Sequence, residues 1–452
     1  MWARGGVLKS GRIWLRIALL ALAGLGVVTA VAGIAGIARA SEGPYDLVRQ
    51  LGRVLVLVEN EYVDPVDRGR LLEGAIKGMV AELDPHSSYL PEEDYRIFEA
   101  DTKGEFGGIG VEVDFRNETV VVIAPIEGSP AARAGIRSGD RIVAIDGSPV
   151  RGRSMQDLIR RMRGKPGSPI VVSVSRGNDD KVVHYPLKRE IIQVASVTSR
   201  LLDGGIAYIK LKQFQSGTRD ELVRAVGQLR GEAHGTLSGV LLDLRNNPGG
   251  LVDEASAVAD ELLTGGVIYT TRHRGETVDS VSAGAGGALS REPMVALVNE
   301  YSASAAELLA GALQDHKRAT IVGAPTFGKG SVQSIIDLPG GAGLRLTTMR
   351  YYTPGGHAIQ AQGIHPDVTI QSGAIDKNLG PIRESDLENH LAPEGAAAPE
   401  SKPSERIVEP VPDGGAPPAT IDLPRDVPRD PTKGKDFALS VGYQILKGTL
   451  KP

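Results

Sequence analysis

Three serines, one histidine and a lysine between two glycines gather in the stretch NEYSASAAELLAGALQDHKRATIVGAPTFGKGSVQ, residues 299–333. A serine hydroxyl is a weak nucleophile and needs a base to take its proton. A lysine can be that base when burial lowers its pKa toward neutrality. Ser304 and Lys329 are therefore a candidate nucleophile and base, provided that backbone N–H groups meet the developing oxyanion.

A structural interpretation of Ser304 competes with the chemical one. Ser304-Ala-Ala-Glu307 is typical of a capping box at a helix start. The two interpretations are compatible, because a helix N-terminus offers free N–H groups and a positive dipole to an oxyanion. His316 would lie about three helical turns beyond Ser304, too far to be its base. His357 and His365 stay open as bases.

A phosphate-binding loop is the second alternative for this stretch. Residues 323–329, GAPTFGK, match G-x-x-x-x-G-K, but Gly330 stands where such a loop needs Ser or Thr. The loop must also open a helix, whereas SVQSIIDL after it alternates like a strand. The pattern therefore argues against nucleotide binding. His86 in DPHSSYL has no partner at metal-ligand spacing, so we expect a structural turn there and no metal site.

The first forty residues predict export. Basic residues precede an apolar run from Ile17 to Ala38, and Ala38-Arg39-Ala40 is a candidate cleavage site. The run is also long enough to stay in a bilayer as an anchor, and both outcomes remain open. Either way, we expect the rest of the chain to be periplasmic or attached to the outer face of the inner membrane.

Composition excludes several classes of protein. The 452 residues include no cysteine, which rules out disulfides, thiolate zinc sites and a cysteine nucleophile. The formal net charge is −4, and more negative without the basic leader, which does not favour nucleic acid.

Periodicity predicts a mixed α/β chain with an N-terminal helical segment, a β-rich module and an α/β core. Strand and helix patterns alternate after residue 190, and SGVLLDLRNN reads as a buried strand. Thr218-x-x-Glu221 predicts another capping box. The expected organisation is a leader (1–40), a helical region (41–100), the β-rich module (101–189), the core (190–370), a disordered linker rich in Pro and Ala (371–435) and a final helix (436–452).

Several ordered motifs resemble the carboxyl-terminal processing peptidases, tail-specific serine proteases of family S41. They are LDPHSSYLP, GIGVEV, GSPAARAGIRSGDRIVAIDG, LLDLRNNPGG, NEYSASAAE, FGKGSVQ and RYYTPGGHAIQAQGIHPDV. The resemblance implies a core of crotonase-like or ClpP-like type and no cofactor. It also implies an inserted PDZ domain, which would bind the C-terminal peptide of a protein substrate.

The resemblance assigns the catalytic roles. Ser304 becomes the nucleophile and Lys329 the general base, and Gln333 would orient the lysine ammonium, for which an amide oxygen is a suitable acceptor. Asp315 matches a position implicated in some members, although a plain helix-end carboxylate fits it equally. The implied oxyanion hole uses Gly249, Gly250 and the N–H of Ala305.

In the module, the resemblance implies a peptide groove. The loop Gly107-Gly108-Ile109-Gly110 would offer N–H groups to a terminal carboxylate. Leu158 would line the groove; core packing is the alternative, and both can hold for different faces of its helix. The expected function is an exported serine endopeptidase that cuts substrate tails through an acyl-enzyme. A homo-oligomer or a bound adaptor protein is a further expectation, and the alternative function is a non-catalytic PDZ scaffold.

Overall fold

The computed structural model describes residues 44–116, 119–126, 128–176, 182–371, 382–393, 405–408 and 427–451. The leader predicted over residues 1–40 lies outside these ranges. Among the described residues, no helix combines the length and hydropathy that a bilayer crossing requires.

The chain divides after Gly78 into two compact units. The first contains helix α2 (Pro44–Glu61) and most of α3 (Arg68–Ala81), in line with the apolar spacing of this region. The second begins at Met79 and continues through β1 (Ser88–Leu90) and α4 (Glu92–Thr102).

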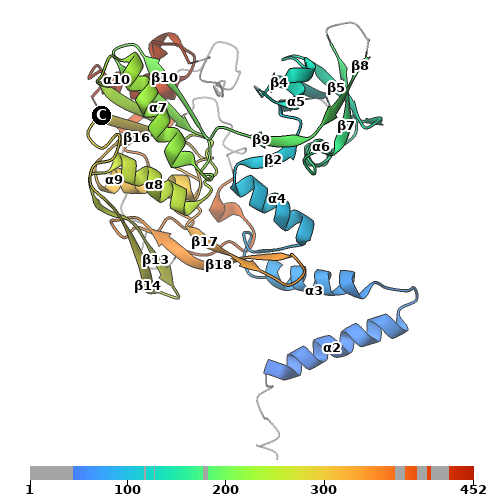
Figure 1. Ribbon diagram of the computed structural model, residues 1–452. Coiled ribbons are helices and arrows are strands. Elements are labelled where there is room, and N and C mark those ends of the chain that lie inside the picture. Colours follow the sequence, from blue (N-terminus) through green and yellow to red (C-terminus); the bar gives the residue numbers. More distant parts are fainter. Residues whose placement is uncertain are drawn as a thin grey trace, which may run out of the picture. The chain divides into compact units, whose positions relative to one another are not determined.

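The β-rich module is a sheet in the order β3-β4-β5-β7-β8, with β6 beside β5. Its elements are β3 (Val111–Arg116), β4 (Thr119–Pro125), α5 (Pro130–Ala134), β5 (Arg141–Ile145), β6 (Ser148–Pro149), α6 (Met155–Met162), β7 (Pro169–Ser175) and β8 (Val182–Lys188). The chain enters through β2 (Glu105–Gly108) and leaves through β9 (Glu190–Gln193), which pair antiparallel (Figure 1). Apolar side chains from these elements form one separate core.

The core of the second unit is a seven-stranded sheet in the order β10-β11-β12-β15-β16-β19-β20. All neighbours are parallel except β10 and β11. The strands are β10 (Val197–Leu202), β11 (Ile206–Leu211), β12 (Gly239–Asp243), β15 (Met294–Val298), β16 (Thr320–Gly323), β19 (Val368–Gln371) and β20 (Glu405–Val408).

Helices cover both faces of this sheet. One face packs with α7 (Thr218–Glu232), α8 (Val252–Leu262) and α9 (Ala305–Asp315). The other packs with α10 (Phe437–Leu446). Strand β12 is buried at every residue, as its continuous apolar sequence predicts.

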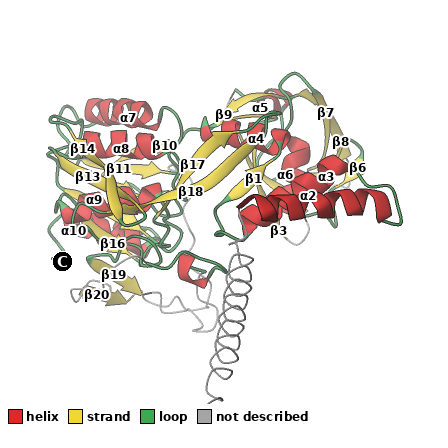
Figure 2. Ribbon diagram, turned by 90° about the horizontal axis from the view of Figure 1, so that it is seen from below, coloured by secondary structure: helices red, strands yellow, loops and turns green. Residues whose placement is uncertain are grey.

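A second sheet of five strands packs beside α8 and α9. It contains β1, β13 (Gly266–His273), β14 (Glu276–Ala283), β17 (Ser331–Asp337) and β18 (Gly343–Tyr352). Strands β17 and β18 form a long antiparallel pair (Figure 2). Lys329 stands just before β17, so this pair fixes one end of the loop that carries it.

Parts of the interval 371–435, for which composition predicts a linker, are held against the core. The short helix η1 (Glu384–Asp386) and the strand β20 belong to this interval, and η3 (Pro431–Lys433) precedes α10. Large apolar residues are scarce here, but Glu384 is fully buried and hydrogen-bonded. Around η1 the chain is thus held by buried polar contacts, which composition does not reveal.

Candidate active site

Ser304 stands at the N-cap of α9, in the connection from β15. Its backbone has φ 56° and ψ −118°. L-residues seldom adopt such a conformation, which costs about 1–3 kcal/mol. The surrounding bonds hold it there: Ala303 N–H donates to the Asn247 carbonyl at 2.9 Å, and the Ser302 hydroxyl donates to the Leu244 carbonyl at 2.8 Å. Backbone strain held at one serine is typical of a functional residue.

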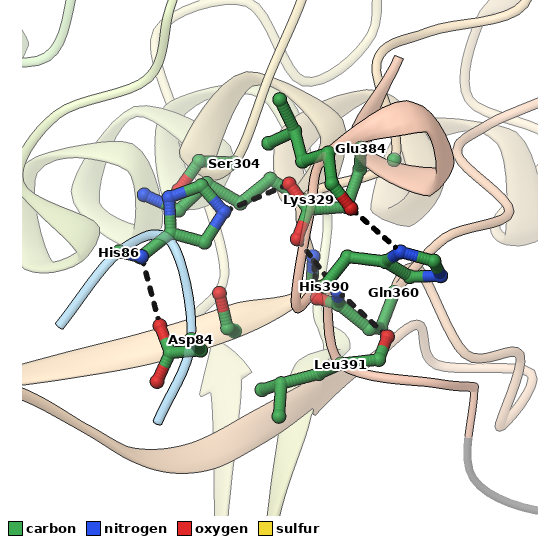
Figure 3. Close-up of polar contacts among 12 residues, drawn as sticks. Asp84, His86, Ser304, Lys329, Gln360, Glu384, His390 and Leu391 are labelled. Atoms are coloured by element: carbon green, nitrogen blue, oxygen red, sulfur yellow. Dashed lines mark hydrogen bonds and ion pairs between the residues drawn. The ribbon is translucent and has the colours of Figure 1, made fainter. Parts of the chain in front are cut away.

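Lys329 lies on the loop between β16 and β17 and lines the same cavity as Ser304, of about 580 Å³. Both side chains appear in the close-up of Figure 3. Burial of the ammonium, followed by the positive charge of Arg345, lowers the pKa of Lys329 to about 8. A minor neutral fraction therefore exists at neutral pH and grows as the pH rises toward 8, and this neutral form is the one that a general base requires.

Glu307 joins the two candidate residues. Its buried carboxylate accepts hydrogen bonds from the N–H groups of Ser304 (2.8 Å), Gly328 (2.7 Å) and Lys329 (2.8 Å), and from the Thr326 hydroxyl (2.5 Å). Burial raises the pKa of Glu307 to about 7, and these donors oppose the rise. The capping-box motif predicts the bond to Ser304, but the three bonds to the lysine loop could not be read from it.

The glycine turn after β12 lies against Ser304. A Cβ on Gly249 (φ 100°) would be 2.9 Å from the Ser304 Cβ and 3.0 Å from the Ala305 nitrogen. The Gly249 N–H already donates to the Asn247 side chain at 2.9 Å. Within the described chain, the N–H groups of Ala305 and Gly250 donate no hydrogen bond. Of the three predicted oxyanion donors, these two are therefore available.

Gln333 also lines the cavity. Its amide nitrogen donates to the hydroxyls of Ser331 (3.0 Å) and Thr347 (3.3 Å), and Thr347 in turn donates to Asp84 at 3.1 Å. These bonds set the direction of the amide. The turn at Asp84, from the LDPHSSYLP motif, thus supports Gln333 from a distant part of the sequence.

Comparison with known proteins decides the family. Residues 205–370 match the model of peptidase family S41, residues 121–176 match a PDZ domain, and residues 33–94 match the "Activating protease CtpB N-terminal domain". The chain is 38% identical over 414 residues, 90% of each chain, to the "Carboxy-terminal-processing protease" of Bartonella bacilliformis. The chain belongs to peptidase family S41.

Membership of S41 makes this chain a serine-type peptidase with a PDZ domain, as the motifs predict. A "Probable CtpA-like serine protease" of Staphylococcus aureus (strain COL) is 37% identical over 328 residues, 72% of this chain and 65% of that one. The solved structure of a photosystem II D1 C-terminal processing protease is 33% identical and covers 68% of this chain and 84% of that one, with a TM-score of 0.44.

Asp315 is not among the residues that line the cavity shared by Ser304 and Lys329. It is the last residue of α9, at the opposite end of that helix from Ser304. Its carboxylate accepts a hydrogen bond from the Gly355 N–H at 2.7 Å. The structure therefore favours the helix-end interpretation of this residue. His316, His357 and His365 are not among the residues that line the cavity.

The phosphate-loop alternative is wrong. The loop of Lys329 leads into strand β17 and not into a helix. Its N–H groups at Gly328 and Lys329 are bound by the Glu307 carboxylate, and that of Gly330 is bound by the Gln360 side chain at 3.0 Å. An anion cradle needs free N–H groups, which this loop lacks.

The predicted peptide-binding residues of the PDZ domain lie in three different settings: in a paired strand, just after that strand, and in the domain core. Gly107 and Gly108 lie in β2, paired with β9. Ile109 and Gly110 follow the strand, and their N–H groups have no acceptor among the described residues. Leu158 is fully buried in the domain core, so the core-packing alternative holds and it presents no surface to a peptide.

His86 occupies a turn, as expected, and no group of three His, Asp or Glu residues within the described ranges has the arrangement of a metal site. Its ring nitrogen Nε2 lies 2.8 Å from Glu384 Oε2 (Figure 3). The sequence does not identify Glu384 as a buried residue near the site, because Glu384 lies in a segment whose composition predicts a linker.

Proposed function

We propose that the protein cleaves protein substrates near their C-termini with Ser304 as nucleophile and Lys329 as general base. The supporting observation is a buried lysine of lowered pKa that shares one cavity with a strained serine and free N–H groups. Neutral Lys329 takes the Ser304 proton, and Oγ attacks the peptide carbonyl. The Ala305 and Gly250 N–H groups stabilise the oxyanion.

The remaining steps are those of an acyl transfer through a covalent intermediate. The lysine ammonium gives its proton to the leaving amine, and an acyl-enzyme forms on Ser304. Water, deprotonated by Lys329, then releases the new C-terminus. The side-chain amide oxygen of Gln333 accepts no hydrogen bond from the described residues, so it suits the proposed role of orienting the Lys329 ammonium.

We propose that the PDZ domain supplies the preference for tails. The N–H groups of Ile109 and Gly110 would bind the terminal carboxylate, and the preceding residues would add as a strand beside the groove. The apolar wall of the cavity, which includes Phe214, Tyr269 and Tyr351, would hold a side chain next to the scissile bond.

Ser304→Ala and Lys329→Ala should each abolish cleavage of a tail substrate while the circular dichroism spectrum stays that of the wild type. Mass spectrometry should detect an acyl adduct on Ser304 in the active protein. A non-catalytic PDZ scaffold predicts tail binding with neither turnover nor adduct. Wild-type cleavage by either variant would refute the dyad.

We propose in addition that the enzyme acts outside the cytoplasm. The support is the basic and apolar pattern of residues 4–40. Sequencing the N-terminus of the protein isolated from cells, together with cell fractionation, tests both the export and the choice between a cleaved leader and an anchor.

A further inference from the structure

A segment beyond the core, residues 382–393, lies against the loop that carries Lys329; we call it the C-terminal strap. Arg383 Nη2 donates to the Thr326 carbonyl at 2.6 Å, and the Glu384 N–H donates to the Phe327 carbonyl at 3.2 Å. Thr326 and Phe327 directly precede the Gly328-Lys329 pair that Glu307 holds from α9. The loop is therefore fixed from two sides.

The Glu384 side chain reaches the other end of the same loop through Gln360. The Gln360 amide nitrogen donates to Glu384 Oε1 at 2.8 Å, and its carbonyl oxygen accepts the Gly330 N–H at 3.0 Å. Glu384 and Gln360 are 0% and 1% exposed, so water cannot replace these bonds. A buried chain of hydrogen bonds thus joins the strap to the residue after Lys329.

His86 completes the contacts of Glu384, at 2.8 Å from Oε2. The backbone of the His86 turn is fixed in turn by Asp84, whose Oδ1 accepts the His86 N–H at 2.9 Å. The strap therefore connects the lysine loop with the turn that supports Gln333. Figure 3 shows Asp84, His86, Gln360 and Glu384 together with Lys329.

Charged groups from four elements act on the Lys329 ammonium. Arg345 on β18 disfavours its charge, whereas Glu384 on the strap, Asp84 on the turn before β1 and Glu307 on α9 favour it. Burial would raise the pKa of Glu384, but the hydrogen bonds from His86 and Gln360 lower it below its ordinary value. Glu384 is thus a fixed negative charge near the base.

We propose that Glu384 is a positioning residue for the general base: the C-terminal strap holds the Lys329 loop in its productive geometry, and the Glu384 carboxylate tunes the charge of the lysine. The inference rests on the proposed function. The strap is in this sense part of the active site, although it follows the peptidase core in the sequence.

Two variants separate the two roles. Glu384→Ala breaks the hydrogen-bond chain, and we expect kcat per folded enzyme to fall about 100-fold, the cost of a misplaced catalytic group, with KM little changed. Glu384→Gln can keep both bonds, since its amide can accept from Gln360 and donate to His86. Because only the charge is lost, kcat at high pH should stay within about tenfold, and the acidic limb of the pH–rate profile should move to lower pH.

Controls exclude a general effect on folding. Glu388 lies on the same strap and is exposed, so Glu388→Gln removes the same charge without touching the buried bonds. This variant should leave the pH–rate profile unchanged. The fraction of folded protein, measured by circular dichroism, gives the amount of enzyme to which kcat refers, because the yield of acyl adduct on Ser304 would itself fall when Lys329 is displaced. In Glu384→Gln/Gln360→Glu the charge moves from position 384 to position 360. The bonds that link Gly330, residue 360, residue 384 and His86 can re-form, and the bond from Gln360 to the Leu391 carbonyl is lost. This variant should therefore recover part of the kcat lost in Glu384→Ala.

The inference fails if Glu384→Ala keeps wild-type kcat per folded enzyme, or if Glu384→Gln has an unshifted acidic limb. Such results would leave the dyad intact as long as Ser304→Ala is inactive. Cleavage by Ser304→Ala would instead refute the proposed function itself.

Discussion

At the scale of single residues, Glu307 connects the proposed nucleophile, Ser304, with the proposed base, Lys329. One carboxylate holds the backbone of Ser304, which would otherwise relax from its strained conformation, and the backbone of Lys329. All four of its partners are donors, since the Thr326 hydroxyl itself accepts from the Ile364 N–H at 2.7 Å. The site therefore demands an acceptor with two oxygens, and no neutral side chain of this size supplies one.

Glu307→Gln should reduce kcat by about 100-fold or more, because the amide NH₂ would face N–H donors and displace the lysine loop. Steady-state kinetics on a tail peptide measures the effect. Glu221 is a matched control: it also accepts two backbone N–H groups, from Ser196 and Val197, but away from the cavity. Glu221→Gln should lower the melting temperature and leave kcat per folded enzyme unchanged; an equal loss of kcat in both would contradict the role given to Glu307.

At the scale of elements, helix starts illustrate what the sequence can predict. Ser154, a residue type that favours helix starts, caps α6 and accepts from the Asp157 N–H at 3.2 Å. The capping box predicted at Thr218 is wrong: Gly217 is the N-cap of α7, and Glu221 accepts hydrogen bonds from outside its helix instead. At Ser304 the motif is formed through Glu307, but its carboxylate also serves a loop further along the chain. Local patterns identify such elements, whereas the long-range partner of a carboxylate depends on the folded chain.

The turn at Gly249 gives a prediction at this scale. Gly249→Ala would place a methyl group 2.8 Å from the Ala303 carbonyl and 3.0 Å from the Ala305 nitrogen, so the proposed oxyanion donor, the Ala305 N–H, must shift. We expect a loss of kcat of about 100-fold, typical of a lost oxyanion donor. Gly217→Ala has the same kind of backbone (φ 85°) with open space around the new methyl group, and it should remain active. Kinetics with thermal melting of both variants separates the local clash from backbone strain.

At the scale of the whole molecule, the last helix returns to the strand that leads to the oxyanion turn. Arg245, two residues beyond β12, binds Asp436 with two hydrogen bonds of 2.8 Å and also binds the buried Asp243. Asp436 caps α10 through the Leu439 N–H at 3.0 Å. The motif LLDLRNNPGG predicts the strand and turn, but nothing near it in sequence identifies the distant aspartate that completes the charge pairing.

Asp436→Ala should lower the free energy of unfolding by about 3 kcal/mol, because it removes a helix cap and one partner of a buried ion pair. Asp436→Asn keeps an acceptor for the cap and should lose less. Chemical denaturation monitored by circular dichroism measures both. Equal stability of Asp436→Ala and the wild type would mean that α10 is not anchored through Arg245.

The position of the C-terminal strap has a consequence for biosynthesis. The ribosome synthesises Ser304 and Lys329 before Glu384, so a growing chain contains the proposed nucleophile and base while the loop that carries Lys329 still lacks its bonds to the strap. The proposed active site is therefore complete only after the C-terminal strap has been synthesised and has folded. A chain that ends before the strap would lack Glu384 and the hydrogen bonds from the strap that hold the Lys329 loop.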